Sequence, residues 1–161
     1  LLISGPGVIR QGAVGARVGL HDLSQTILDL CGLQSLPTSD SRSFAPLLRG
    51  ELGDEAFTVG YAEYFGGRIL LTQRVLWDGE WKFVFNGFDE DELYNLQEDP
   101  YETCNLIRDS RHLARAEAMM REIWRRMAET GDNSLLNSDY FPLRVGLVGP
   151  DNLSSDPMRS W

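Results

Sequence analysis

The fold is decided by the stretch ELYNLQEDPYETCNL, residues 92–106. Leu93 is expected to face the interior from a short strand, and Tyr94 to pack on the other side of it. Pro100 fixes a turn after Asp99, whose carboxylate can accept backbone N–H bonds. The stretch therefore predicts a structural corner that joins a strand to the element that follows it.

The segment before this corner predicts an antiparallel sheet. Its apolar, β-branched and aromatic runs are separated by turn residues, and Asp78-Gly79 is a strong hairpin signal between two of them. With the strand in the corner, the expected strands cover residues 57–64, 68–76, 81–85 and 92–96. The pattern predicts a meander of about four antiparallel strands.

An amphipathic helix is predicted after the corner and ends near Gly131. Asp109 or Ser110 is positioned to cap it. Its apolar positions recur at helical spacing: Leu113, Ala116, Met120, Ile123, Trp124 and Met127. We expect this helix to lie across the sheet, and residues 131–161, with their prolines and glycines, to form an irregular wrapping tail.

The first fifty residues have a different character. Two short apolar strand pieces flank the turn Gly5-Pro6-Gly7, and a helix is expected from an N-cap at Asp22 to a stop at Gly32. A shift in composition at residues 51–55 marks a subdomain boundary. Because the chain opens without Met on what reads as a buried strand, we expect further sequence upstream of residue 1.

Composition excludes several classes of protein. The chain has 161 residues, is 42% hydrophobic and carries a formal net charge of -9, which argues against nucleic acid as a partner. No apolar run approaches the ~20 residues of a membrane helix, so no membrane association is expected. Cys31 and Cys104 lack metal-site spacing; we expect two free, mostly buried thiols, with a single disulfide as the alternative.

One polar cluster carries the candidate site. The cluster consists of Tyr61, Glu63, Tyr64 and Arg68, which bracket the turn Gly66-Gly67 at a strand end, where polar side chains can line a cleft. Arg68 can hold a sulfate or carboxylate with two parallel hydrogen bonds. We therefore name Tyr64 and Arg68 as candidate substrate-binding residues; the alternative is a cross-strand ion pair between Arg68 and Glu63. The acidic run 89–92 lacks calcium-loop spacing and reads as a solvated turn.

Four segments in this order resemble the C-terminal portion of arylsulfatase-like enzymes of the alkaline-phosphatase superfamily. They are the LISGPGVI strand and turn (residues 2–9), the DLSQTILDLCGL helix (22–33), PLLRG (46–50) and the corner at 92–106. The resemblance implies an α+β fold. Residues 1–50 would be the tail end of the sulfatase α/β domain, 51–130 a C-terminal subdomain of sheet and helix, and 131–161 the wrapping tail.

The resemblance also implies a chemistry that these residues do not supply. Full-length sulfatases use a formylglycine made from Cys or Ser in a C/S-x-P-x-R context, together with a divalent metal, usually calcium. No such motif occurs here, so we expect no catalytic residue and no metal ligand in this chain. The implied partners are a missing N-terminal sulfatase domain and, in the complete enzyme, a sulfate-ester substrate.

Three functions stay open from the sequence. The first is the C-terminal region of a sulfuric ester hydrolase, inactive alone, that contributes structural support and the rim of the substrate cleft. The second is the tail of a related phosphodiesterase or phosphonate monoester hydrolase. The third is a stand-alone interaction module. The sequence specifies no cellular compartment.

Overall fold

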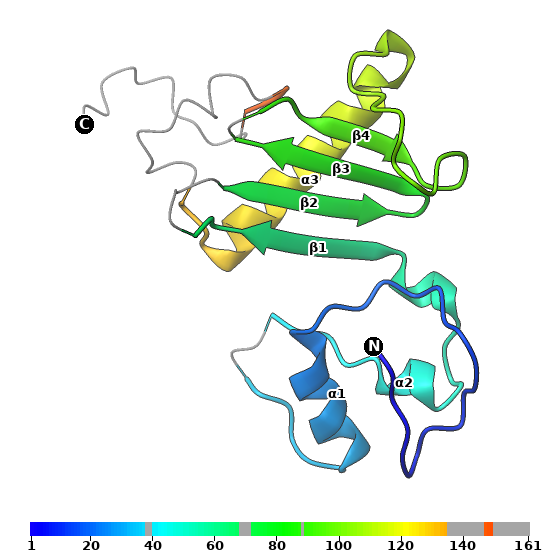
Figure 1. Cartoon of the computed structure of the whole chain (residues 1–161). Helices are drawn as coiled ribbons and strands as arrows, with labels where there is room; N and C mark the ends of the chain where they lie inside the picture. The colour runs from blue at the N-terminus through cyan, green and yellow to red at the C-terminus, as the bar shows by residue number, and fades with distance from the viewer. Residues whose placement is uncertain (38–39, 68–71, 88, 135–146, 150–161) are drawn as a thin grey trace. The chain divides into compact units, whose positions relative to one another are not determined.

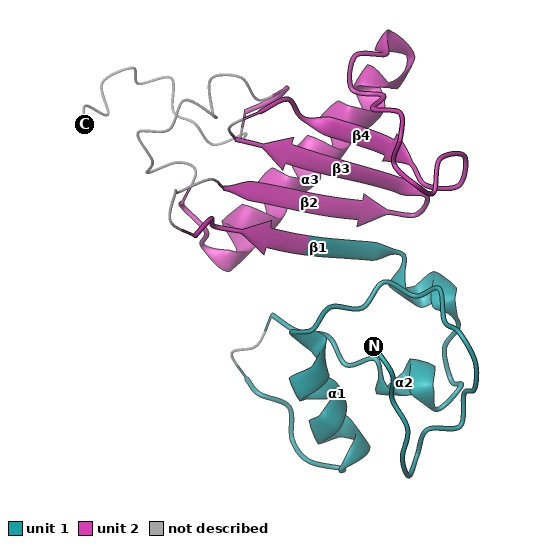
Figure 2. Cartoon of the chain, viewed as in Figure 1, with its two compact units in different colours: residues 1–61 teal, residues 62–161 magenta. Residues whose placement is uncertain are grey.

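The computed structural model describes residues 1–37, 40–67, 72–87, 89–134 and 147–149 (Figure 1). The chain forms two compact units, Leu1–Tyr61 and Ala62–Trp161 (Figure 2). This division into two units does not test the three domains expected from the sequence (1–50, 51–130 and 131–161). That domain organisation stays a prediction. No helix in the described ranges is long and apolar enough to cross a membrane.

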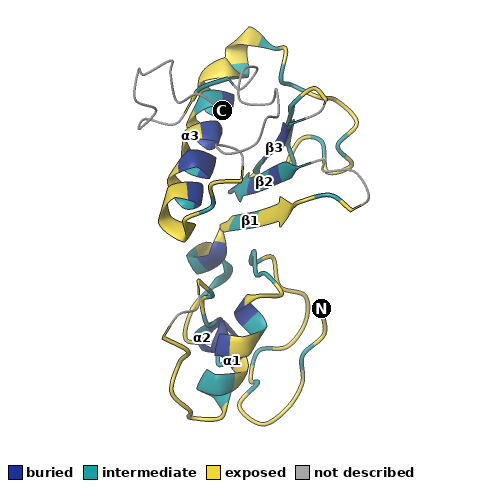
Figure 3. Cartoon of the chain, turned by 90° about the vertical axis from the view of Figure 1, so that its left-hand side faces the viewer, coloured by how far each residue is buried: buried dark blue, intermediate teal, exposed yellow. Residues whose placement is uncertain are grey.

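Unit 1, residues 1–61, contains little regular structure. Its elements are α1 (Asp22–Leu30), α2 (Ala45–Leu48) and the short 3₁₀ helix η1 (Asp54–Phe57). A small apolar core gathers residues from the last two elements and the segment before them: Phe44, Leu47, Leu48 and Phe57. Many residues of the loops in this unit are exposed (Figure 3).

Side chains of α1 hold the loops of unit 1 in place. Asp22 is the first residue of the helix and not its N-cap, which corrects the expectation from sequence. Its carboxylate accepts hydrogen bonds from the backbone N–H of Gly19 (2.9 Å) and of Arg42 (2.8 Å). The helix ends where expected, because Gly32 adopts a left-handed φ of 68°.

Unit 2, residues 62–161, is built on a sheet whose first strand starts in unit 1. The four strands are β1 (Val59–Tyr64), β2 (Gln73–Asp78), β3 (Trp81–Asn86) and β4 (Glu92–Asn95), in the order β1-β2-β3-β4. Pairs β2–β3 and β3–β4 are antiparallel. Asp78 pairs with Trp81, so Gly79 and Glu80 form a two-residue hairpin loop. The predicted meander is confirmed; of the expected strand 68–76, residues 68–71 lie outside the described residues.

One long helix, α3 (Leu113–Thr130), packs on one face of the sheet against β2 and β3. It follows a short 3₁₀ helix, η2 (Ser110–His112), which Asp109 caps by accepting from the Arg111 N–H. The apolar positions differ from those expected in two places: Leu113 is 42% exposed, and Met119, which the sequence analysis did not include, is buried. The buried residues of α3 lie on the side that faces the sheet (Figure 3).

The corner at residues 92–106 forms as the sequence indicates. The Asp99 carboxylate accepts from the Cys104 N–H (2.8 Å) and the Thr103 hydroxyl (3.0 Å). The hydrogen bond from Cys104 is the main reason that the pKa of Asp99 is lowered. The Leu106 N–H donates to the Leu93 carbonyl (2.8 Å), which joins the corner to β4. Both cysteines are free, as expected, but both are exposed and not buried.

Candidate functional site

The structure places one of the two predicted site residues. Tyr64 is the last residue of β1, and its side chain is 52% exposed. Arg68 lies outside the described residues, so the alternative of an ion pair between Arg68 and Glu63 is not tested. The Tyr64 ring offers an apolar face and a hydroxyl that both donates and accepts, a combination suited to binding.

The sequence analysis missed the most constrained cation of this region, Arg74 in β2. Its side chain has no exposed surface, and its guanidinium is surrounded by acceptors. Nη2 donates to Asp132 Oδ2 (2.7 Å) and to Ser134 Oγ (2.8 Å), just after the end of α3. The alternation of a strand gives the signal that could have found it: Arg74 shares the face of Leu76, which is buried against the helix.

Asp132 is the counter-ion of Arg74. Burial opposes ionisation of this carboxyl, but hydrogen bonds from Ser134 and Arg74 outweigh burial and lower the pKa of Asp132. The Asp132 carboxyl is therefore ionised at neutral pH. Glu63 Oε1 also lies 3.7 Å from Arg74 Nε, so Asp132 is the nearer of two carboxylates that balance this buried charge.

On the other face, at the same end of the sheet, amides and carboxylates bind one another. Gln73 donates to Asn86, whose Nδ2 donates to Glu92 Oε1 (3.0 Å). The Tyr94 hydroxyl donates to Glu92 Oε2 (2.9 Å). Burial, together with Glu92, raises the pKa of Tyr94 to about 12. This network satisfies its own members, which indicates a structural role for it.

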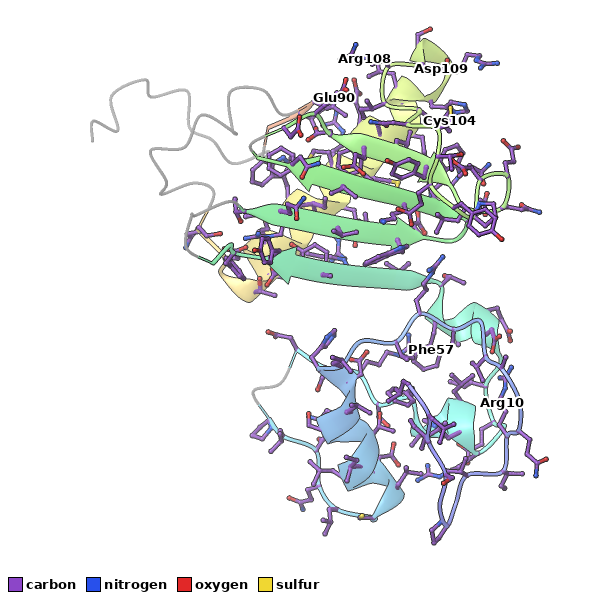
Figure 4. All side chains as sticks on the ribbon, in the orientation of Figure 1. Arg10, Phe57, Glu90, Cys104, Arg108 and Asp109 are labelled. Atoms are coloured by element: carbon purple, nitrogen blue, oxygen red, sulfur yellow. The ribbon has the colours of Figure 1, made fainter. Side chains whose placement is uncertain are left out.

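The acidic turn between β3 and β4 is anchored by Asp91. The Asp91 carboxylate accepts from the Asn86 N–H (2.8 Å). Burial, with Glu90 and Glu92 nearby, raises the pKa of Asp91 to about 6. Glu90 forms an exposed ion pair with Arg108 (Figure 4). Within the described ranges, no group of three or more His, Cys, Asp or Glu could hold a metal ion.

The sheet and helix recur in solved structures of ester hydrolases. A 2-O GAG sulfatase superposes with a TM-score of 0.66 at 22% identity, over 73% of this chain and 26% of that one. A phosphonate monoester hydrolase from Silicibacter pomeroyi gives 0.57 at 25% identity, over 71% of this chain and 26% of that one. This chain therefore shares its fold with about a quarter of each of these two enzymes.

Residues 1–130 match the family described as N-sulphoglucosamine sulphohydrolase, C-terminal. The chain belongs to this family of sulfatase C-terminal domains. Choline-sulfatase of Rhizobium meliloti is 30% identical in an alignment 121 residues long, which covers 69% of this chain and 22% of the enzyme. An uncharacterised protein of Haemophilus influenzae is 32% identical over 116 residues, 71% of this chain and 59% of that protein. The chain thus spans less than two thirds of the length of these relatives.

Proposed function

We propose that this chain is the C-terminal part of a sulfuric ester hydrolase and is inactive alone. It completes an upstream catalytic domain, supports it, and contributes Tyr64 and Arg68 to the rim of the substrate cleft. The observation that carries the proposal is the family match over residues 1–130. The share of 22% that the chain spans in choline-sulfatase leaves ample length there for a catalytic domain.

The surface of unit 1 supports this proposal. Unit 1 exposes many large apolar side chains, among them Leu1, Leu2, Ile9, Leu20, Ile27, Leu33 and Leu36. An upstream α/β domain that packs on unit 1 would cover residues of this kind.

Calcium and formylglycine belong to the upstream part of the proposal. In the complete enzyme, formylglycine would supply the nucleophile and the metal would stabilise the charge of the sulfate group. The described residues offer no cluster that would hold a metal, so we assign no step of the reaction to this chain. Its contribution is to bind and orient the substrate.

The test compares the 161-residue chain with the protein extended to its upstream coding sequence. The extended protein is expected to hydrolyse an aryl sulfate, and a reagent that blocks formylglycine should abolish that activity. The chain alone is expected to be inactive. Sulfatase activity of the isolated chain, sensitive to the same reagent, would disprove the proposal.

A related hydrolase is the second candidate, favoured by the likeness to phosphonate monoester hydrolase. The two candidates differ in the ester that the extended protein prefers. A kcat/KM at least tenfold higher for an aryl phosphonate monoester than for an aryl sulfate would select the second.

The stand-alone module is the third candidate, and one observation favours it. Matches of similar length cover 59% of the Haemophilus protein but 22% of choline-sulfatase, so the former is much the shorter protein. A module that functions alone should be monomeric and bind little hydrophobic dye. Strong dye binding, reduced by Leu20→Ser and Ile27→Ser, would instead support a missing domain.

A further inference from the structure

The last two residues of β1, Glu63 and Tyr64, and the next residue, Phe65, are linked to one buried guanidinium, that of Arg74. Glu63 Oε1 lies 3.7 Å from Arg74 Nε. The Phe65 ring centroid lies 4.4 Å from Arg74 Cζ. Between them, the Tyr64 carbonyl accepts from Thr72 Oγ1 (3.2 Å), and this hydroxyl in turn accepts from Arg74 Nη1 (2.7 Å).

The same guanidinium is fixed from the opposite side. Nε and Nη2 both donate to Asp132 Oδ2, at 3.3 Å and 2.7 Å, and Nη2 also donates to Ser134. Because the guanidinium is planar and its donors have fixed directions, these bonds determine where Nη1 points. Arg74 is completely buried, so it does not itself reach a substrate.

We infer that Arg74 is a positioning residue: with Thr72 it sets the backbone of residues 63–65 and thereby aims the exposed Tyr64 side chain. The inference rests on the proposed function only where it assigns Tyr64 to the substrate. The two hydrogen bonds that join Arg74 to Thr72 and Thr72 to the Tyr64 carbonyl then control substrate affinity. They do not affect the chemical step, because Tyr64 binds the substrate and does not react.

A first experiment measures the position of the backbone without any activity. Chymotrypsin cuts after aromatic residues, so the rate of cleavage after Tyr64 and Phe65 in the 161-residue chain reports how firmly this segment is held. Arg74→Lys and Thr72→Val should each raise that cleavage rate about tenfold. The variants are compared under conditions in which urea unfolding gives them the same free energy of unfolding. Arg115→Lys is the matched control, since Arg115 pairs with Asp78 at the other end of the sheet (2.8 Å).

The control should change cleavage at this segment less than twofold. Equal cleavage in all three variants would overturn the inference. Should Arg74→Lys fail to fold, Thr72→Val still decides, because it removes the relay hydroxyl but keeps Arg74 and its bonds to Asp132, and Nη1 retains the Gln73 carbonyl as an acceptor (2.8 Å).

A second experiment uses the extended enzyme and separates KM from kcat. Tyr64→Ala, Thr72→Val and Arg74→Lys should each raise KM several-fold and leave kcat within twofold. Thr72→Val added to Tyr64→Ala should have no further effect, because both act through Tyr64. Normal KM values for Thr72→Val and Arg74→Lys beside a raised one for Tyr64→Ala would overturn the positioning role. If Tyr64→Ala itself left KM unchanged, the proposed substrate contact would fall, although a cleavage effect would still support the relay.

Discussion

The two units of this chain are held together in different ways. In unit 1, side chains bind the backbone of loops: Thr26 Oγ1 donates to the Asp22 carbonyl (2.7 Å) and accepts from the Phe44 N–H (3.0 Å). In unit 2, strand ladders and a sheet–helix core dominate, with Phe83 and Leu93 fully buried. Unit 2 therefore rests on strand ladders and a large apolar core, whereas unit 1 combines a small apolar core with single polar contacts.

The surfaces differ in the same direction. Most of the exposed large apolar residues belong to unit 1, whereas in the described part of unit 2 they are Tyr64, Phe65, Tyr101 and Leu113. A layer that belongs to a larger α/β domain would leave such residues uncovered when seen alone. The contrast supports the proposal that unit 1 continues an upstream domain and that unit 2 is an attached subdomain.

The largest expected effect tests whether the two cores are independent. Phe83→Ala should destabilise unit 2 by about 3–5 kcal/mol, because it opens a cavity in a closed core. Phe44→Ala, in the core of unit 1, should shift the same transition by less than about 1 kcal/mol. Tryptophan fluorescence in urea distinguishes the two, since all four tryptophans follow residue 61. Equal shifts would show one cooperative unit and end the comparison.

The next effect tests the polar contacts of unit 1. Thr26→Val removes the acceptor of the Phe44 N–H and should cost about 1–3 kcal/mol, because that donor stays buried without a partner. Hydrogen exchange of the Phe44 amide, followed by NMR, should accelerate accordingly. Thr130→Val, at the exposed end of α3, serves as control. An unchanged exchange rate at Phe44 would show that the loop is held by something else.

A smaller effect depends on pH. The pKa of Asp91 is raised to about 6, so the folded state binds a proton more tightly than the unfolded state. The resulting stability is full below the ordinary aspartate pKa and is lost as pH rises through about 6. Asp91→Asn should therefore be more stable than the natural chain by about 1–2 kcal/mol at pH 7.5, a value discounted for partial exposure.

Urea unfolding at two pH values checks this prediction. The advantage of Asp91→Asn should shrink by about half at pH 5, where Asp91 is largely protonated. Asp89→Asn, on the exposed part of the same turn, should show no such trend. An advantage that grew toward acid pH would contradict the assigned cause.

The smallest effect concerns the corner. Glu102 adopts a left-handed φ of 57° and pairs with Lys82. Because the pair is partly exposed, Glu102→Gln should cost at most about 1 kcal/mol in urea unfolding. Glu98→Gln, on the exposed turn of the same corner, is the control. A loss above 2 kcal/mol would mean that the ion pair holds the corner together.

Local signals predicted the elements of unit 2 well. The Asp78-Gly79 dipeptide predicted a hairpin here, although the loop is Gly79-Glu80, one residue later. Gly131, with a φ of 69°, ends α3 where the sequence indicated. Asp99 organises the corner through bonds to nearby residues, so its role could be anticipated. These features depend on neighbours within a few positions along the chain.

The candidate site was only partly predictable. Tyr64 was named from its place beside a glycine turn, and the structure leaves it exposed at a strand end. Arg74 was missed, because its partner Asp132 lies 58 residues further along the chain. The prediction that both cysteines are buried was wrong, because both are exposed. The general tendency of cysteine to be buried does not say which face of the fold a particular cysteine occupies.

The sequence by itself determined the family, the meander and the amphipathic helix, because turn chemistry and side-chain periodicity act locally. Only the tertiary structure decided which strand residue would become the buried centre of charge. A guanidinium can be buried only where a carboxylate and other acceptors converge on it. For Arg74 those acceptors come from beyond the end of α3 and from β1, and folding alone brings them together.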